Sequence, residues 1–367
     1  MKINRKYISA VFLLISLFSC IMLAGCDQEA LFWAIAHELP PITPIIGGHP
    51  SVIVRMDSTN TLYVSNDIGI WYWQYNSITV PEIVIPNWNP MEHQPPSRIR
   101  DLAVVGNRLF ALGSNGIVYA GNGTTWEPDP ITGPGNVQRI FGAGTYLFAG
   151  TFDGIENYAI WSMAGTGTAL IELQSVDGLL RGAAYNGTNY ILGTQGGGVY
   201  TGSGISISRD DTFPDSTIMG ITSVGSTIYM VTPGAVYQYG PPHIHIGSGH
   251  RFTGAISAWN HSGQSLLLLG IQEGSGSYSY GYREIQISPT GSFKMPGTSD
   301  PTSMAIGSGI SSAIRSRAVN HLYVMPQFHS TGDDDHRPII FAATQRNGVW
   351  SYRVRNGIAQ WNGENNR

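Results

Sequence analysis

Cysteine is almost absent from this sequence. The two cysteines are Cys20 and Cys26, so the chain after residue 26 contains no thiol. That part of the chain cannot form an internal disulfide, and packing alone must stabilise it. It is long enough to bury a large hydrophobic core as one all-β domain.

Positive charge is also scarce. Three of the 20 basic residues, Lys2, Arg5 and Lys6, and none of the 24 acidic residues lie in the first 26 positions, which leaves a net charge of −7 beyond them with neutral histidines. The only lysine in that part is Lys294. Single, scattered cations provide neither a surface for nucleic-acid phosphates nor a polybasic patch for anionic lipid. We therefore expect no nucleic-acid partner.

Common catalytic motifs are missing as well. There is no Gly-x-Ser-x-Gly elbow and no phosphate-binding loop, and His37-Glu38 continues as Leu39-Pro40-Pro41 instead of completing a zinc-protease motif. Glycines at 196–198 and 202–204 are not followed by a helix start, so we interpret them as hairpin glycines. The sequence predicts a protein without a cofactor that is not an enzyme.

The N-terminus has the pattern of a secretion signal. A cationic start precedes an apolar run of 12 residues from Val11 to Met22, and Leu23-Ala24-Gly25-Cys26 follows. Such a run is shorter than the roughly 20 residues that span a bilayer, which disfavours the alternative of an uncleaved anchor. Residues 1–25 are therefore predicted to be a signal peptide.

The segment Leu23-Ala24-Gly25-Cys26 resembles the lipobox of bacterial lipoproteins. The resemblance implies that Cys26 receives diacylglycerol and becomes the first residue after cleavage, which would hold the protein at a membrane of the cell envelope, facing the periplasm or the surface. Two or more acyl chains give stable anchoring. Asp27 resembles an inner-membrane retention mark of enterobacteria, a rule that other lineages do not follow, so the choice of membrane stays open.

The remaining sequence repeats. Its 46 glycines, 18 tyrosines and 9 tryptophans are typical of short strands joined by tight turns. Seven units each contain a β-branched or aromatic strand, a glycine turn and a second strand, at residues 62–71, 109–119, 146–154, 190–200, 228–237, 266–282 and 339–350. Their turn glycines are 47, 38, 44, 36, 47 and 67 residues apart. Propeller blades recur every 40 to 50 residues or so.

These observations predict an all-β fold, a β-propeller with seven four-stranded blades, with six or eight blades or a β-helix as alternatives. The second unit predicts a whole blade, with strands at 98–105, 108–113, 117–120 and 124–127. Residues 349–354 and 358–361 are expected to be the final two strands. We assign residues 26–50 to a lipidated N-terminus and leader segment and residues 51–367 to the propeller.

Two stretches, Ser65 to Trp71 and Gly121 to Trp126, resemble degenerate Asp-box repeats and the related repeats of assembly-factor and sortilin-like propellers. Some Asp-box propellers are sialidases, in which an arginine cluster grips the substrate carboxylate and a tyrosine acts as nucleophile. Their Arg-Ile-Pro signature is absent, and Arg98-Ile99-Arg100 is the nearest string. A sialidase-like glycosidase is therefore an alternative function.

Histidines supply the candidates for metal or small-ligand binding. His243 and His245 share one face of a predicted exposed strand, near His250. The loop from 329 to 336 gathers hard oxygens and imidazoles, with His329, Asp333, Asp335 and His336 as weak metal candidates. Neither group is a complete ligand set, so no metal site is predicted.

In a propeller, the loops that join the second strand to the third, and each blade to the next, meet around one end of the channel. We expect binding there, from residues 86–93 with an exposed Trp88 and from residues 241–251. The candidate binding residues are Trp88, His93, His243 and His245, with the alternative that Trp88 folds back over its own blade. The leading hypothesis is a membrane-anchored, non-enzymatic scaffold that binds a protein or glycan.

Overall fold

The computed structural model describes residues 46–47, 49–75, 88–214, 216–240, 243–248, 251–261, 264–272, 280–287, 293–294, 318–325, 339–345, 348–355 and 358–363. The chain divides into two compact units, Met1–Thr43 and Pro44–Arg367, and every described residue belongs to the second. Within these ranges, no helix is long and apolar enough to cross a membrane.

The described strands form seven antiparallel sheets, which we number as blades 1 to 7. Blade 1 contains β1 (Val52–Met56), β2 (Thr61–Ser65), β3 (Ile70–Gln74) and β4 (Asn89–Pro90). Blade 2 contains β5 (Ile99–Val105), β6 (Arg108–Gly113) and β7 (Val118–Gly121). Blade 3 contains β8 (Val137–Ala143), β9 (Tyr146–Phe152), β10 (Tyr158–Ala164) and β11 (Ile171–Val176). A short 3-10 helix, Asp57–Thr59, joins β1 to β2.

Blade 4 contains β12 (Leu180–Tyr185), β13 (Tyr190–Thr194), β14 (Val199–Ser203) and β15 (Ser206–Arg209). Blade 5 contains β16 (Gly220–Val224), β17 (Thr227–Val231), β18 (Ala235–Gln238) and β19 (Ile244–Ser248). Blade 6 contains β20 (Phe252–His261), β21 (Gln264–Gln272), β22 (Tyr280–Ile287) and β23 (Phe293–Lys294). Blade 7 contains β24 (Val319–Met325), β25 (Ile339–Thr344), β26 (Gly348–Arg355) and β27 (Ile358–Gly363).

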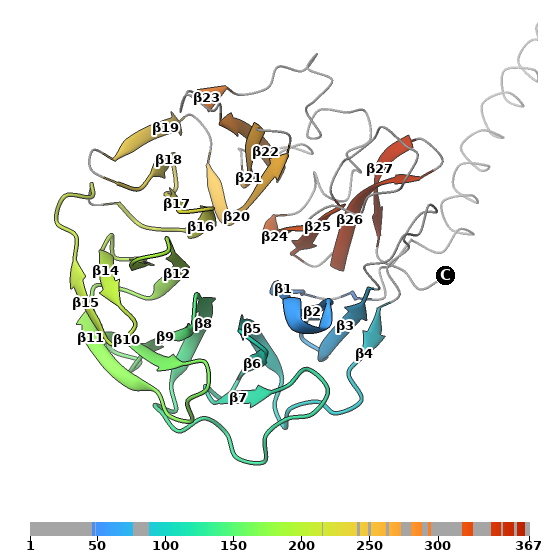
Figure 1. The fold of residues 1–367 in the computed structure, drawn as a ribbon, viewed down its shortest axis with the longest axis vertical. Coiled ribbons are helices and arrows are strands. Elements are labelled where there is room, and N and C mark those ends of the chain that lie inside the picture. The colour runs from blue at the N-terminus through green and yellow to red at the C-terminus, as the bar shows by residue number, and fades with distance from the viewer. Residues whose placement is uncertain are drawn as a thin grey trace, which may run out of the picture. The chain divides into compact units, whose positions relative to one another are not determined.

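The first strands of the blades form a closed ring. Each packs against the next in the order β1, β5, β8, β12, β16, β20 and β24, and β24 packs against β1. Figure 1 shows these strands around the centre and the later strands of each sheet farther out. The chain is therefore a β-propeller, as predicted, and the seven sheets of the described residues agree with the predicted repeat.

The repeat was predicted from its central hairpins, and these are confirmed. Six of the seven predicted units reach from the second strand of a blade into its third strand, and the unit at 146–154 covers the second strand β9 and the start of the turn after it. The turn glycines Gly116, Gly154 and Gly348 have positive φ angles of 78°, 93° and 73°. Such angles suit glycine because it lacks a Cβ, and they explain why these positions marked the repeat.

Blade 2 departs from the prediction in its fourth strand. Residues 124–127 were expected to form a short strand, but they form a single bridge, Gly121 to Trp126. The side-chain oxygen of Asn122 accepts hydrogen bonds from the N–H groups of Thr124 and Thr125 at 2.9 Å each, which closes a turn. Pro128 and Pro130 then lack the N–H groups that a longer ladder needs.

Blades 1 and 7 join through an apolar seam. Trp73, Trp88 and Phe341 are buried together, with ring centroids 5.9 to 6.2 Å apart. Ile46 is also fully buried in this cluster, and its carbonyl accepts the Val349 N–H at 3.1 Å. The seam closes the ring by side-chain packing, because each of the two blades is built from its own stretch of chain.

The prediction of an exposed Trp88 is therefore wrong. Its side chain is 0% exposed. The segment predicted as a loop includes β4, whose two residues pair with Tyr72 and Trp71, and this pairing places the preceding tryptophan in the seam. The alternative, in which Trp88 folds back over its own blade, is closer to the structure, although the Trp88 side chain also packs against blade 7.

Replacing Trp88 tests the seam. Trp88→Ala should lower the free energy of unfolding by about 3–5 kcal/mol, since it removes a large buried aromatic side chain and leaves a cavity. Chemical denaturation measures the loss. Ile68→Ala, a change at an exposed position, should alter stability by less than about 0.5 kcal/mol. Equal stability of the two variants would mean that Trp88 does not hold the seam.

Candidate functional site

The centre of the ring contains a cavity of about 760 Å³. Its lining comes from β1, β5, β8, β16, β20 and β24, together with Asp57. Because every sheet is antiparallel, the second-to-third-strand turns lie at the end of the ring where each first strand begins. We call this end of the cavity the channel mouth.

Bulges shape the first strands near the channel mouth. In blades 2, 3, 4 and 7, one extra residue interrupts the pairing with the second strand. All four extra residues are polar: Arg100, Gln138, Arg181 and Asn320. Arg100 Nη1 donates to Gln138 Oε1 at 3.0 Å, so the extra residues of blades 2 and 3 contact each other. Bulges of this kind re-aim side chains at the rims of sheets.

A buried carboxylate joins blades 2 and 3 directly after these bulges. The Asp101 side chain is only 3% exposed, and Arg139 Nε donates to its Oδ2 at 2.8 Å. The Ile140 N–H also donates to Oδ2, at 3.2 Å, and the Leu102 N–H donates to Oδ1 at 3.1 Å. These N–H groups occupy both carboxylate oxygens, so Asp101 is a structural anchor and not a free acid or base.

His321 occupies the same position in blade 7. Its Nδ1 accepts the Ile53 N–H at 3.4 Å, across the seam to blade 1. Burial, with a smaller contribution from the positive charge of Arg139, lowers the pKa of His321 to about 4. The imidazole is therefore neutral at pH 7. Because Nδ1 is the acceptor, we assign its proton to Nε2.

The opposite end of the cavity carries a second ion pair. Arg55 Nε lies 2.8 Å from Asp57 Oδ1, and the guanidinium stacks on the Tyr75 ring at 5.5 Å. Burial raises the pKa of Tyr323 beside it, so this hydroxyl stays protonated. The charges at this end are thus locally balanced.

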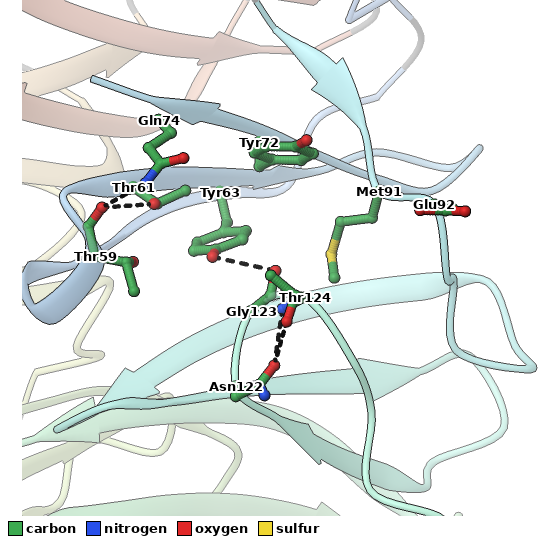
Figure 2. Close-up of a pocket in the computed structure, with 10 residues that line it drawn as sticks. All are labelled: Thr59, Thr61, Tyr63, Tyr72, Gln74, Met91, Glu92, Asn122, Gly123 and Thr124. Atoms are coloured by element: carbon green, nitrogen blue, oxygen red, sulfur yellow. Dashed lines mark hydrogen bonds between the residues drawn. The ribbon is translucent and has the colours of Figure 1, made fainter. Parts of the chain in front are cut away.

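A smaller pocket of about 220 Å³ lies between blades 1 and 2, and Figure 2 shows its lining. The Tyr63 hydroxyl donates to the Gly123 carbonyl at 3.3 Å, and Thr61 donates to the Thr59 carbonyl at 3.1 Å. A Cβ at Gly123 would lie 2.1 Å from the Tyr63 hydroxyl, so only glycine fits there. Because Tyr63 and Thr61 already bond within the protein, we interpret the pocket as part of the packing between blades 1 and 2.

The structure separates the histidines predicted to bind. His93 is exposed in the loop after β4, and its carbonyl accepts the Trp126 Nε1–H at 2.9 Å. His245 pairs with Tyr237 through the backbone of β19. Cys26, His250, His329, Asp333, Asp335 and His336 lie outside the described residues. Within the described ranges, no group of three or more histidine, cysteine or acidic residues could hold a metal.

His243 is buried, contrary to the expected exposed strand. Its side chain is 6% exposed; the Gly240 N–H donates to Nδ1 at 3.2 Å, and Nε2 lies 3.1 Å from Thr212 Oγ1. The Thr212 hydroxyl donates to Asp210 at 2.6 Å, as does the Tyr239 hydroxyl at 2.7 Å. Burial favours a higher pKa for Asp210, but these hydrogen bonds outweigh it and lower the pKa. Both nitrogens of His243 are engaged, so this histidine is structural.

Two exposed isoleucines project at the channel-mouth end. Ile68 is 75% exposed and Ile155 is 80% exposed, each in the turn between the second and third strands of its blade. Asn66 Oδ1 accepts the Ile68 N–H at 3.0 Å, and Asp153 Oδ1 accepts the Ile155 N–H at 2.9 Å. Side-chain bonds of this type fix a turn. Both turns follow strands of the predicted repeat, but their isoleucines were not among the predicted binding residues.

Comparison by sequence finds no protein-family model and no curated protein that matches the chain. Comparison by structure finds similar propellers. The WD40 β-propeller domain of Doa1 is 11% identical with a TM-score of 0.54, covering 84% of this chain and 94% of that chain. A chain of the mitotic checkpoint complex is 12% identical, with a TM-score of 0.57 and coverage of 86% and 93%.

A third similar structure is YCF48 bound to D1 peptide. It is 13% identical, with a TM-score of 0.51, and the match covers 86% of this chain and 94% of that chain. At such low identity, these comparisons show the fold alone: the chain is a β-propeller.

Acidification tests the role of His321. Since its folded pKa is about 4, below the ordinary histidine value of 6.5, its contribution to stability is complete above pH 6.5 and is lost as the pH falls toward 4. His321→Asn keeps an acceptor but does not titrate. Unfolding at pH 7 and pH 4.5 or so should therefore show a smaller acid-induced loss of stability in this variant than in the parent. His93→Asn is the matched control and should lose as much as the parent.

Proposed function

We propose that this chain is a lipid-anchored, non-enzymatic scaffold of the bacterial cell envelope, whose propeller binds a protein or glycan. Two lines of support combine. The Leu23-Ala24-Gly25-Cys26 segment supports the anchor, and the propeller fold supports the scaffold role. Similar propellers include one bound to a peptide and one within a multiprotein complex.

The observation that carries the binding role is the pair of rigid, apolar tips at the channel mouth. Ile68 and Ile155 are strongly exposed on turns whose backbones are fixed by Asn66 and Asp153. A turn whose backbone is already fixed loses little conformational entropy when a partner covers it. The tips therefore suit contact with another macromolecule.

The contacts of Asp101 and Arg100 near the channel mouth do not favour a catalytic role for these two residues. The oxygens of Asp101 accept N–H groups from Arg139 and from the backbone. Arg100, part of the string closest to a sialidase signature, is tied to Gln138. A general acid or a nucleophile would need a group with a spare hydrogen-bonding position directed at substrate. The glycosidase alternative gains no specific support from these contacts.

Crosslinking in intact cells, followed by affinity purification, tests the tips. A variant with Ile68→Asp and Ile155→Asp should lose most of its crosslinked partner, since burying a carboxylate at an apolar contact is unfavourable. Ile205→Asp is the control, because Ile205 is 72% exposed in a turn at the opposite end. If the double variant and the control retain the partner equally, the tips are not the binding surface.

The anchor is tested separately. Cys26→Ala should release the protein from the membrane fraction and abolish incorporation of a fatty-acid probe, because the proposed acyl chains hold it there. Cys20→Ala, a change within the predicted signal peptide, should leave labelling intact. Continued labelling of the Cys26→Ala variant would contradict the lipobox assignment.

A further inference from the structure

Hydrogen-bond donors predominate at the channel mouth. Arg139 lines the cavity with a side chain that is 36% exposed, and its bond to Asp101 uses Nε. His321 also lines the cavity, and its Nδ1 is occupied by the Ile53 N–H. The proton assigned to Nε2 makes the imidazole a donor there. Asp101, the nearby carboxylate, already accepts three N–H groups.

A second guanidinium belongs to the neighbouring blade, at the same end of the ring. Arg181 is the extra residue in the bulge of β12, and β12 packs against β8, which carries Arg139. Within the described residues, its recorded partner is the neutral side chain of Gln195. Burial and, secondarily, the charge of Arg139 lower the pKa of Arg181, in agreement with two cations placed close together.

The charged side chains that line the cavity balance one another, and Arg181 is not among the lining residues of this cavity. The carboxylates among its described lining residues are Asp57 and Asp101. Asp57 is paired with Arg55 at the opposite end, and Asp101 is paired with Arg139. Arg181 therefore adds positive charge near the channel mouth that no described carboxylate offsets. An uncompensated cation in a partly desolvated site attracts an anion more strongly than one in open solvent.

We propose that the channel mouth binds a carboxylate, held by Arg139 and Arg181 and by the Nε2–H of His321. A guanidinium can donate two parallel N–H groups to a carboxylate. A neutral imidazole can donate one more N–H from another direction. The cavity volume of about 760 Å³ falls within the usual range for ligand sites. Thr222, Ser223 and Ser257 line other walls and offer hydroxyl groups to a hydroxylated acid.

The carboxylate has two sources with the same chemistry: a free small hydroxy acid or an acidic side chain of a bound protein. Calorimetric titration of the purified full chain with citrate, and separately with a capped tri-glutamate peptide, distinguishes them. Citrate alone would indicate a free acid, and the peptide alone would indicate a partner's side chain. Glycerol, which has hydroxyls but no charge, should give no saturable heat.

The matched variants are Arg181→Gln and Arg209→Gln. Both remove one positive charge, but Arg209 is on the outermost strand of blade 4, where it pairs with Asp177 and Asp211. Arg181→Gln should weaken binding of the effective probe by about tenfold, and Arg209→Gln should leave it nearly unchanged. His321→Asn should also weaken binding, because it removes the Nε2–H donor.

Two results would overturn the proposal. The first is the absence of saturable binding of both citrate and the peptide. The second is equal affinity in the Arg181→Gln and Arg209→Gln variants, which would locate the bound anion elsewhere. The site is independent of the scaffold role, since loss of a crosslinked partner in the isoleucine tip variants says nothing about citrate in the channel.

Discussion

The packing of blade 1 against blade 7 is the constraint on which the rest of the structure depends. A propeller blade buries its faces against its two neighbours, so an open ring would leave two apolar faces in water. Both terminal blades are continuous stretches of chain, with no strand shared between them. Closure therefore relies on the Trp73, Trp88 and Phe341 cluster and on hydrogen bonds such as that from Val349 to Ile46.

The same closure explains why polar groups gather in the channel. The first strands approach one another so closely that a Cβ at Gly142 would lie 2.1 Å from the Val104 carbonyl oxygen of the neighbouring blade. Apolar side chains fill the space between sheets, while the innermost edges meet through hydrogen bonds. Asp101 with Arg139, and His321 with the Ile53 N–H, are two such contacts. In this structure, the Asp101–Arg139 ion pair of the channel also joins blades 2 and 3.

The sequence predicted the parts of the fold that depend on local chemistry. Strand alternation and turn glycines identified the central hairpins, and Gly116, Gly154 and Gly348 have the positive φ that favours glycine. The predictions that failed concern contacts between residues that lie on different strands or far apart in the sequence. Trp88 is buried because Phe341, far away in the sequence, packs against it. The bulges that set Arg100 and Arg181 out of register depend on pairing with a second strand, and alternation along one strand cannot reveal them. The His243 network joins residues from two blades.

The electrostatics of the channel also show why net charge was a poor guide to ligand class. The sequence is acidic, with a formal net charge of −4, and on that basis it offered no surface for phosphate backbones. That conclusion concerns extended, exposed surfaces, where charges more than about 8 Å apart are screened at physiological ionic strength. Inside the ring, screening is weaker, and of the described acidic residues Asp57 and Asp101 line the cavity. Whether a small anion can bind at the channel mouth is decided by the guanidinium groups of Arg139 and Arg181, whose positions depend on the register of β8 and β12.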